Sequence, residues 1–101
     1  MIKHIVFFQL ADEAEGKTKA ENARIIKEGL ENLIHIIPEL KKIEVGINLP
    51  EAPVTNYEVA LYSEFESMKE LDIYSKHPAH LKITDYIGKV RKARVCVDYE
   101  I

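Results

Sequence analysis

Residues 2–10 read Ile-Lys-His-Ile-Val-Phe-Phe-Gln-Leu, a run rich in β-branched and aromatic side chains. Such a run is typical of a β-strand. Successive side chains of a strand point to opposite faces of the sheet. Ile2 and Val6 therefore share one face, while Ile5 and Phe7 lie on the other. Because both faces carry apolar side chains, we expect a central strand that is covered on both sides.

Helical and extended patterns alternate along the rest of the chain. An apolar stripe at spacings of three and four predicts a helix that ends before Pro38. The members of this stripe are Ala23, Ile26, Leu30, Leu33 and Ile37. Alternating apolar residues predict three further strands, over residues 43–49, 57–65 and 93–101. The polar residues 11–16 are expected to connect the first strand to the helix.

A second helical region follows the third strand. Residues 67–70, Ser-Met-Lys-Glu, form a capping box, in which the serine and glutamate side chains each bind a free backbone amide. The helix that begins there is expected to run to about Tyr74, and Pro78 interrupts it. A further helical stretch is expected from about Ala79 to Ile87, with Gly88 at its end.

The predicted order of elements is βαββαβ, which is the α+β ferredoxin-like arrangement. It implies a four-stranded antiparallel sheet with two helices on one face. The other face would stay uncovered, although Tyr62 and Cys96 interrupt the polar sides of two strands. A second copy of the chain would cover it, so we expect a homodimer in which two sheets pack into a dimeric α/β barrel.

Composition excludes several classes of protein. A chain of 101 residues and 11.6 kDa is expected to be a single domain, residues 1–101. Seventeen acidic and fourteen basic residues give a net charge of −3, which argues against nucleic-acid binding. No apolar run is long enough for a membrane span. The single Cys96 and the absence of a signal-like N-terminus predict a cytoplasmic location.

The densest group of chemically active side chains lies in residues 74–80, Tyr-Ser-Lys-His-Pro-Ala-His. Tyr74, His77 and His80 would share one helix face if Pro78 only kinks the helix. A histidine can take a proton from a carbon next to a carbonyl group, and a phenol can stabilise the developing oxyanion. The segment is therefore a candidate site for either ligand binding or proton transfer.

The chain resembles the stress-responsive α/β-barrel (Dabb) family over essentially its whole length. The matching features are the opening residues 2–6, the Val45-Gly46 pair, residues 65–67, the segment 74–80 and the closing residues 97–99. The resemblance implies a dimeric ferredoxin-like barrel. It implies no single activity, because most members of the family have no defined function.

One branch of the family, the plant polyketide cyclases that make olivetolic acid, implies a specific chemistry. In that branch a tyrosine and a histidine of this segment carry out an aldol condensation, and Tyr74 and His80 match them. His80 would be the general base and Tyr74 the oxyanion partner. The cyclase also has a histidine near the start of the third strand, where this chain has Val59.

Three interpretations remain open from the sequence. The first is a stress-associated protein of undefined role that binds a small hydrophobic or carbonyl-bearing ligand in an internal cavity, with His4 and His77 lining the pocket. The second is the cyclase-like, cofactor-independent enzyme. The third is a structural oligomer, in which His77 and His80 only hold helix ends through hydrogen bonds to backbone carbonyls.

No cofactor or dedicated metal site is expected. The four glycines stand far apart, so no glycine-rich phosphate loop exists. His77 and His80 with His4 lack the paired spacings of zinc sites, and Cys96 is remote from them in sequence. In some relatives, the resemblance implies a cation held by main-chain carbonyls at the end of the first helix. Cys96 itself is expected to be a small buried thiol.

Overall fold

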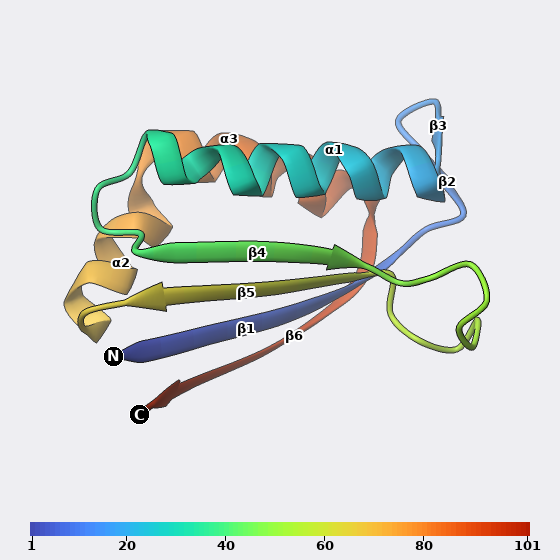
Figure 1. Cartoon of the computed structure of the whole chain (residues 1–101). Coiled ribbons are helices and arrows are strands. Elements are labelled where there is room, and N and C mark those ends of the chain that lie inside the picture. The colour runs from blue at the N-terminus through green and yellow to red at the C-terminus, as the bar shows by residue number, and fades with distance from the viewer.

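Four strands form the main sheet in the order β4-β5-β1-β6, and all neighbours are antiparallel (Figure 1). The computed structural model describes residues 1–101. The strands are β1 (Ile2–Leu10), β4 (Lys42–Ile47), β5 (Val59–Phe65) and β6 (Arg91–Glu100). Strand β1 is central, paired with β5 on one side and β6 on the other, as its two apolar faces predicted.

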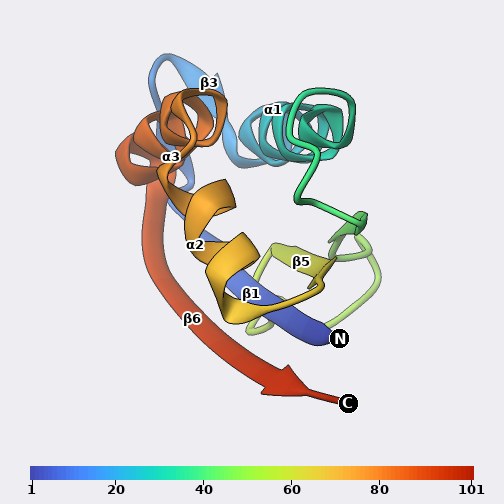
Figure 2. The same ribbon diagram turned by 90° about the vertical axis from the view of Figure 1, so that its left-hand side faces the viewer.

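All the helices cover one face of this sheet (Figure 2). They are α1 (Lys19–Glu31), the short 3-10 helix η1 (Asn32–His35), α2 (Met68–Lys76) and α3 (Pro78–Val90). Helices α1 and α3 lie side by side, and a Cβ atom at Gly29 would stand 2.5 Å from Ile83 Cδ1. A larger residue at position 29 would therefore require the Ile83 side chain to move. The predicted ferredoxin-like α+β fold is confirmed, and no helix is long and apolar enough to cross a membrane.

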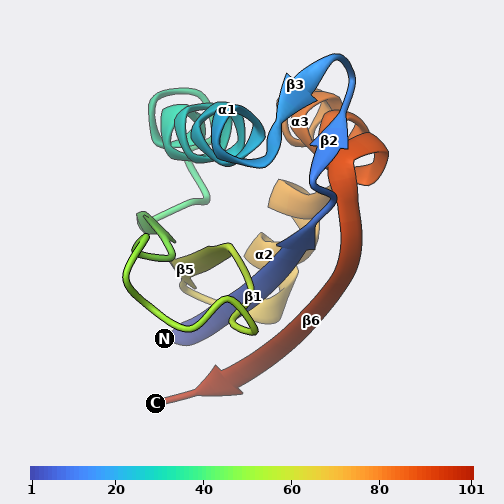
Figure 3. The ribbon, with the colours of Figure 1, turned by 90° about the vertical axis from the view of Figure 1, so that its right-hand side faces the viewer.

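The predicted connector after β1 contains a small hairpin. Strands β2 (Glu13–Ala14) and β3 (Lys17–Thr18) pair above the sheet, beside the start of α1 (Figure 3). Its turn places Glu15 and Gly16 at positive φ values of 53° and 73°. Thr18 then forms a complete capping box with Glu21 and starts α1. Sequence reasoning missed this box because the apolar stripe of the helix begins further along the chain.

The junction between the second and third helices differs in detail from the prediction. Ser67 Oγ accepts from the Glu70 amide at 3.3 Å, but the Glu70 carboxylate binds the Glu66 amide instead of that of Ser67. His77 has an extended backbone, with ψ at 136°, so α2 and α3 are separate helices and not one kinked helix. Helix α3 continues through Gly88, which does not end it.

The core lies between the helices and the inner face of the sheet. It contains alternate residues of β1 and β5, as period-two patterning requires, together with Val45 of β4, whereas β6 contributes no fully buried residue. Its most deeply buried members are Val6, Leu10, Ile26, Leu30, Ile37, Val45, Val59, Phe65, Tyr74 and Val90. Two polar strand residues, His4 and Ser63, are buried on this same face, and the Ser63 hydroxyl donates to the His4 carbonyl at 3.3 Å. These polar groups mark where the core meets the candidate site.

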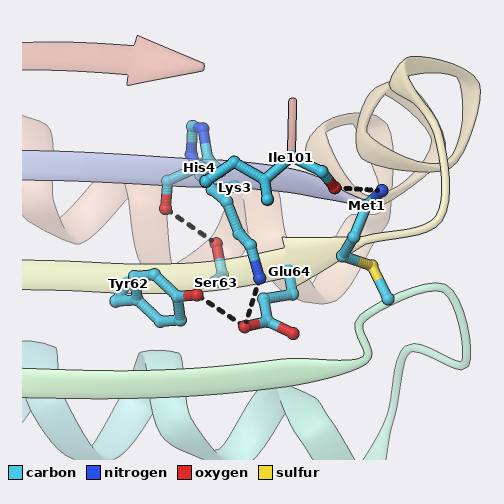
Figure 4. Close-up of polar contacts among 7 residues, drawn as sticks. All are labelled: Met1, Lys3, His4, Tyr62, Ser63, Glu64 and Ile101. Carbon is cyan, nitrogen blue, oxygen red and sulfur yellow. Dashed lines mark hydrogen bonds and ion pairs between the residues drawn. The ribbon is translucent and has the colours of Figure 1, made fainter. Parts of the chain in front are cut away.

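The outer face of the sheet has an apolar part and a polar part. Over β1 and β6 it exposes Phe7, Val95, Val97 and Tyr99, with Val97 59% exposed. Over β1 and β5, Lys3 Nζ lies 2.9 Å from a Glu64 carboxylate oxygen, to which the Tyr62 hydroxyl also donates (Figure 4). A single chain thus leaves the apolar part of this face in water. The expectation that Cys96 lies on this face is wrong, because the register of β6 with β1 places Cys96 opposite the buried Val6 and turns Val95 and Val97 outward.

The cap at Ser67 is expected to stabilise α2. Replacing Ser67 with Ala removes the acceptor for the Glu70 amide and should lower the free energy of unfolding by about 1 kcal/mol. For a domain of this size the melting temperature should fall by about 4–8 °C in a calorimetric scan. Ser67→Asp keeps an acceptor and should stay near the wild type. Equal stability of the Ala and Asp variants would show that this cap contributes nothing.

Candidate functional site

His4 projects from β1 onto the inner face, where a carboxylate holds its ring. The register of β1 with β6 places His4 opposite Asp98, so the two side chains lie on the same face. Asp98 Oδ1 accepts a hydrogen bond from His4 Nδ1. Because a carboxylate oxygen can only accept, Nδ1 is the nitrogen that carries the proton in this contact. Only 10% of the His4 side chain is exposed, so this orientation is well fixed.

His80 lies in the first turn of α3, and its ring is also oriented by an acceptor. Its Nδ1 donates to the Ser75 carbonyl at 3.0 Å. That carbonyl belongs to the last turn of α2, where helical carbonyls lack a partner within their own helix. Because a carbonyl can only accept, Nδ1 carries the proton and Nε2 is free to accept another. Burial lowers the pKa of His80, which keeps the imidazole neutral at pH 7.

A cavity of about 190 Å³ brings the two histidines together. It lies between the inner face of the sheet and helix α3. Its polar lining consists of His4, Ser75, His80, Thr84, Arg91 and Arg94, and its apolar lining of Val6, Phe8, Leu30, Leu61 and Ile87. A small apolar cavity with a few convergent polar groups is the usual form of a ligand site. The volume suits a molecule smaller than a typical drug.

Tyr74 supports His80 from behind. Its ring centroid lies 4.4 Å from that of His80 and 4.9 Å from that of Phe65. The residue is completely buried, and its hydroxyl has no hydrogen-bond partner in the chain. Burial raises the pKa of the phenol, so the hydroxyl stays protonated as a donor. Tyr74 does not line the cavity itself.

His77 lies outside this cavity, in contrast to its predicted place in the pocket. It ends α2 and begins α3, where its Nδ1 accepts from the Ala79 amide at 3.0 Å. Pro78 follows at the first position of α3, where its missing N–H costs nothing. His80 thus makes the expected hydrogen bond to a backbone carbonyl, whereas His77 holds the helix end by accepting from an amide and binds no carbonyl.

Sequence reasoning missed Asp98, Arg91 and Arg94 as site residues. All three belong to β6, where the alternation of apolar and polar residues predicted a strand but gave no sign of a functional site. Pairing β1 against β6 in antiparallel register would have brought Asp98 opposite His4. The arginines follow from the same pairing, since Arg94 lies opposite Phe8 and Arg91 opposite Leu10.

The largest hollow of the molecule, about 540 Å³, lies elsewhere. It involves the outer face, at Phe7, Ala60 and Val95, and the loop before β5. It contains no histidine, cysteine or basic side chain. Because the oriented imidazoles are on the inner face, we place the candidate site in the smaller cavity.

The stress-responsive A/B barrel domain family, Dabb, matches residues 2–101. The chain belongs to the Dabb family. No curated protein sequence matches it. Among solved structures, it is similar to a dimeric ferredoxin-like protein of unknown function from Bacteroides fragilis, at 32% identity and a TM-score of 0.79. That match covers 99% of this chain and 95% of the other.

Two further structures resemble this Dabb domain. A dimeric ferredoxin-like protein of unknown function from Thermobifida fusca has 26% identity and a TM-score of 0.82, with 99% of this chain and 90% of that one covered. A hydroxynitrile lyase from Passiflora edulis has 23% identity and a TM-score of 0.77, with 99% and 92% covered. At that identity, the likeness to the lyase shows the fold alone.

The Tyr74 hydroxyl, which has no hydrogen-bond partner, leads to a prediction about stability. Tyr74→Phe deletes a buried hydroxyl without a partner, so the free energy of unfolding should rise by about 1 kcal/mol in a denaturant titration. Tyr86→Phe is the matched control, because the Tyr86 hydroxyl donates to the buried Asn22 Oδ1 at 2.5 Å. That variant should lose about 1 kcal/mol. A loss of stability in both variants would mean that Tyr74 has a partner.

Proposed function

We propose that this Dabb domain binds a small, carbonyl-bearing ligand in the cavity beneath α3. The observation that carries the proposal is the oriented, neutral His80, whose Nε2 has no partner within the chain. A ligand hydroxyl or an acidic C–H group would meet a base there. The apolar lining favours a short apolar carbon skeleton.

Two arginines at the cavity indicate that the ligand also carries a negative charge. Arg91 and Arg94 line the same cavity as His80 and both are exposed. A guanidinium group binds carboxylate oxygens through paired hydrogen bonds. The preferred ligand therefore has a carbonyl group at one end and an anionic group, such as a carboxylate, at the other.

The second candidate is a cofactor-independent enzyme, and the fixed tautomer of His80 favours it. His80 Nε2 would take a proton from the carbon next to the ligand carbonyl. The C–H bond breaks, the N–H bond forms, and the electron pair moves onto the carbonyl oxygen as an enolate. The Tyr74 hydroxyl, protonated and without a partner, is a donor available to such an oxygen if the cavity widens on binding. An aldol condensation of the polyketide-cyclase type begins with this step.

The compartment and the physiological role are also proposals. A single thiol and no disulfide fit a reducing cytoplasm. The family description supports a role in the response to stress.

Levulinate, which has a ketone and a carboxylate, is the probe for the site. Binding should shift the His80 ring signals in NMR spectra, while pentanoate, which lacks the ketone, should shift them less. Incorporation of deuterium next to the ketone would report proton abstraction. The exchange rate should rise with pH with a midpoint below 6.5, because burial lowers the pKa of His80 and the neutral imidazole is the active form.

Variants separate the two candidate functions. His80→Ala should lower the exchange rate by about 10²–10⁴-fold, and Tyr74→Phe should lower it less. The matched control is His35→Ala, since His35 is an exposed histidine at the end of η1. Binding of levulinate without deuterium exchange would support the binding function and reject the enzymatic one. If levulinate neither shifts the His80 ring signals nor takes up deuterium next to its ketone, the proposed site is wrong.

We also propose that the domain is a homodimer, assembled through the outer face of the sheet. The similar proteins from Bacteroides fragilis and Thermobifida fusca are described as dimeric. Phe7, Val95 and Val97 form an exposed apolar patch on the face without helices. Packing this patch against its copy would remove it from water. The polar group of Lys3, Tyr62 and Glu64 would then lie beside the patch.

Sedimentation equilibrium tests this assembly. The wild type should show twice the 11.6 kDa mass of the chain at micromolar concentration. Val97→Asp puts a charge in the patch and should shift the protein to monomer. Leu81→Asp is the control, because Leu81 is similarly exposed, at 53%, but lies on α3. A wild-type monomer, or dissociation by both variants, would contradict the proposed interface.

A further inference from the structure

Three potential metal ligands meet on the inner face of the sheet. His4 comes from β1, and Cys96 and Asp98 come from β6, with one position between them. Cys96 Sγ lies 3.6 Å from His4 Nδ1 and 3.7 Å from Asp98 Oδ1. All three ligand atoms lie within 4.8 Å of one another. Although Cys96 is remote from His4 in sequence, the pairing of β1 with β6 places the two side by side.

These separations suit a single tetrahedral ion. With bonds of about 2.0–2.3 Å, tetrahedral Zn²⁺ holds its nitrogen, oxygen and sulfur ligands about 3.3–3.6 Å apart. Both distances from the sulfur are close to this range. To admit the ion, His4 and Asp98, which share a hydrogen bond, must move apart, and the imidazole proton must move from Nδ1 to Nε2 so that Nδ1 has a lone pair for the metal. We propose that His4, Cys96 and Asp98 bind a zinc-type divalent ion through Nδ1, Sγ and Oδ1.

The donor set identifies the class of metal. Magnesium and calcium select oxygen ligands, whereas a nitrogen, a thiolate and a carboxylate together suit Zn²⁺ and its neighbours in the first transition row. The thiolate and the carboxylate bring a charge that balances a divalent ion. The ion in turn displaces the thiol proton of Cys96, as coordination does for thiols in general.

The fourth coordination position opens onto a second cavity. This cavity, of about 330 Å³, is lined by the three ligands together with Ser75, Asp72 and Arg94, among others. Three protein ligands with an open fourth position describe a site that exchanges water or substrate. Arg94, which lines the same cavity, favours an anion as the fourth ligand, such as hydroxide or a carboxylate.

The rigidity of the site follows from its backbone. All three ligands belong to two strands that pair along their whole length, and sites on such elements hold their geometry better than loops do. The site does not depend on the proposed function. His80 is not one of the ligands, and its free nitrogen is in the neighbouring cavity.

Titration of the full chain with Co²⁺ alone, a coloured substitute for Zn²⁺, tests the proposal. One equivalent per chain should produce intense visible bands of tetrahedral Co²⁺ and a thiolate-to-metal charge-transfer band. Cys96→Ser should lose the charge-transfer band, and Asp98→Asn should weaken binding by at least about tenfold. His80→Ala should bind the ion as the wild type does, which separates this result from a failure of the proposed function.

Two controls match the ligands. Asp72→Asn alters the other carboxylate of the same cavity, and His35→Ala removes an exposed histidine elsewhere. Both should retain the full titration. In the wild type, Zn²⁺ should also slow alkylation of Cys96 by iodoacetamide, a measurement that requires no variant. The proposal is overturned if Co²⁺ gives no charge-transfer band, if Zn²⁺ gives no protection, or if Asp72→Asn weakens binding as much as Asp98→Asn.

Discussion

The antiparallel pairing of β1 with β6 is the constraint on which the rest of the molecule depends. Side chains alternate between faces with a period of two, so a shift of one residue would move every side chain of β6 to the other face. In the observed register, His4 faces Asp98 and Val6 faces Cys96 on the helix side. Ile5 faces Val97 and Phe7 faces Val95 on the open side. One register thus positions both the cluster of His4, Cys96 and Asp98 on the inner face and the exposed apolar patch on the outer face.

Desolvation determines the charge state of three titratable side chains around the candidate site. Burial disfavours charge, so it lowers the pKa of His80 and raises those of Tyr74 and of the Cys96 thiol. All three groups are therefore neutral at pH 7 in the free chain. A neutral imidazole is a base, and a neutral phenol is a donor. This is the combination that proton transfer next to a carbonyl requires.

The break between α2 and α3 connects the fold to this chemistry. His77 caps α3 and Pro78 occupies its first position, so the chain turns between the two helices. The turn leaves the Ser75 carbonyl without a helical partner, and His80 binds it. It also brings the ring of Tyr74 against that of His80 across the break. The backbone hydrogen bond of His80 thus serves the helix junction and orients the imidazole at the same time.

The sequence by itself determined the order of the four main strands and the helices between them, the central position of β1 and the presence of Tyr74 and His80 in one region, but not the small β2–β3 hairpin. These features follow from local periodicity, from the effect of proline on helices and from a motif of seven contiguous residues. Alternation also predicted the uncovered outer face, because two apolar faces on one strand need two covers.

Only the tertiary structure decided which side chains meet. Asp98 and Cys96 adjoin His4 through a strand register that depends on packing across the whole sheet, with partners more than ninety residues apart. Sequence spacing gave no sign of the His4, Cys96 and Asp98 cluster because it measures distance along the chain, whereas the three side chains meet through strand pairing. In the same way, the helical spacing of Tyr74, His77 and His80 suggested one shared face. The extended backbone of His77 excludes that arrangement, and it leaves His77 as a cap and His80 in the cavity.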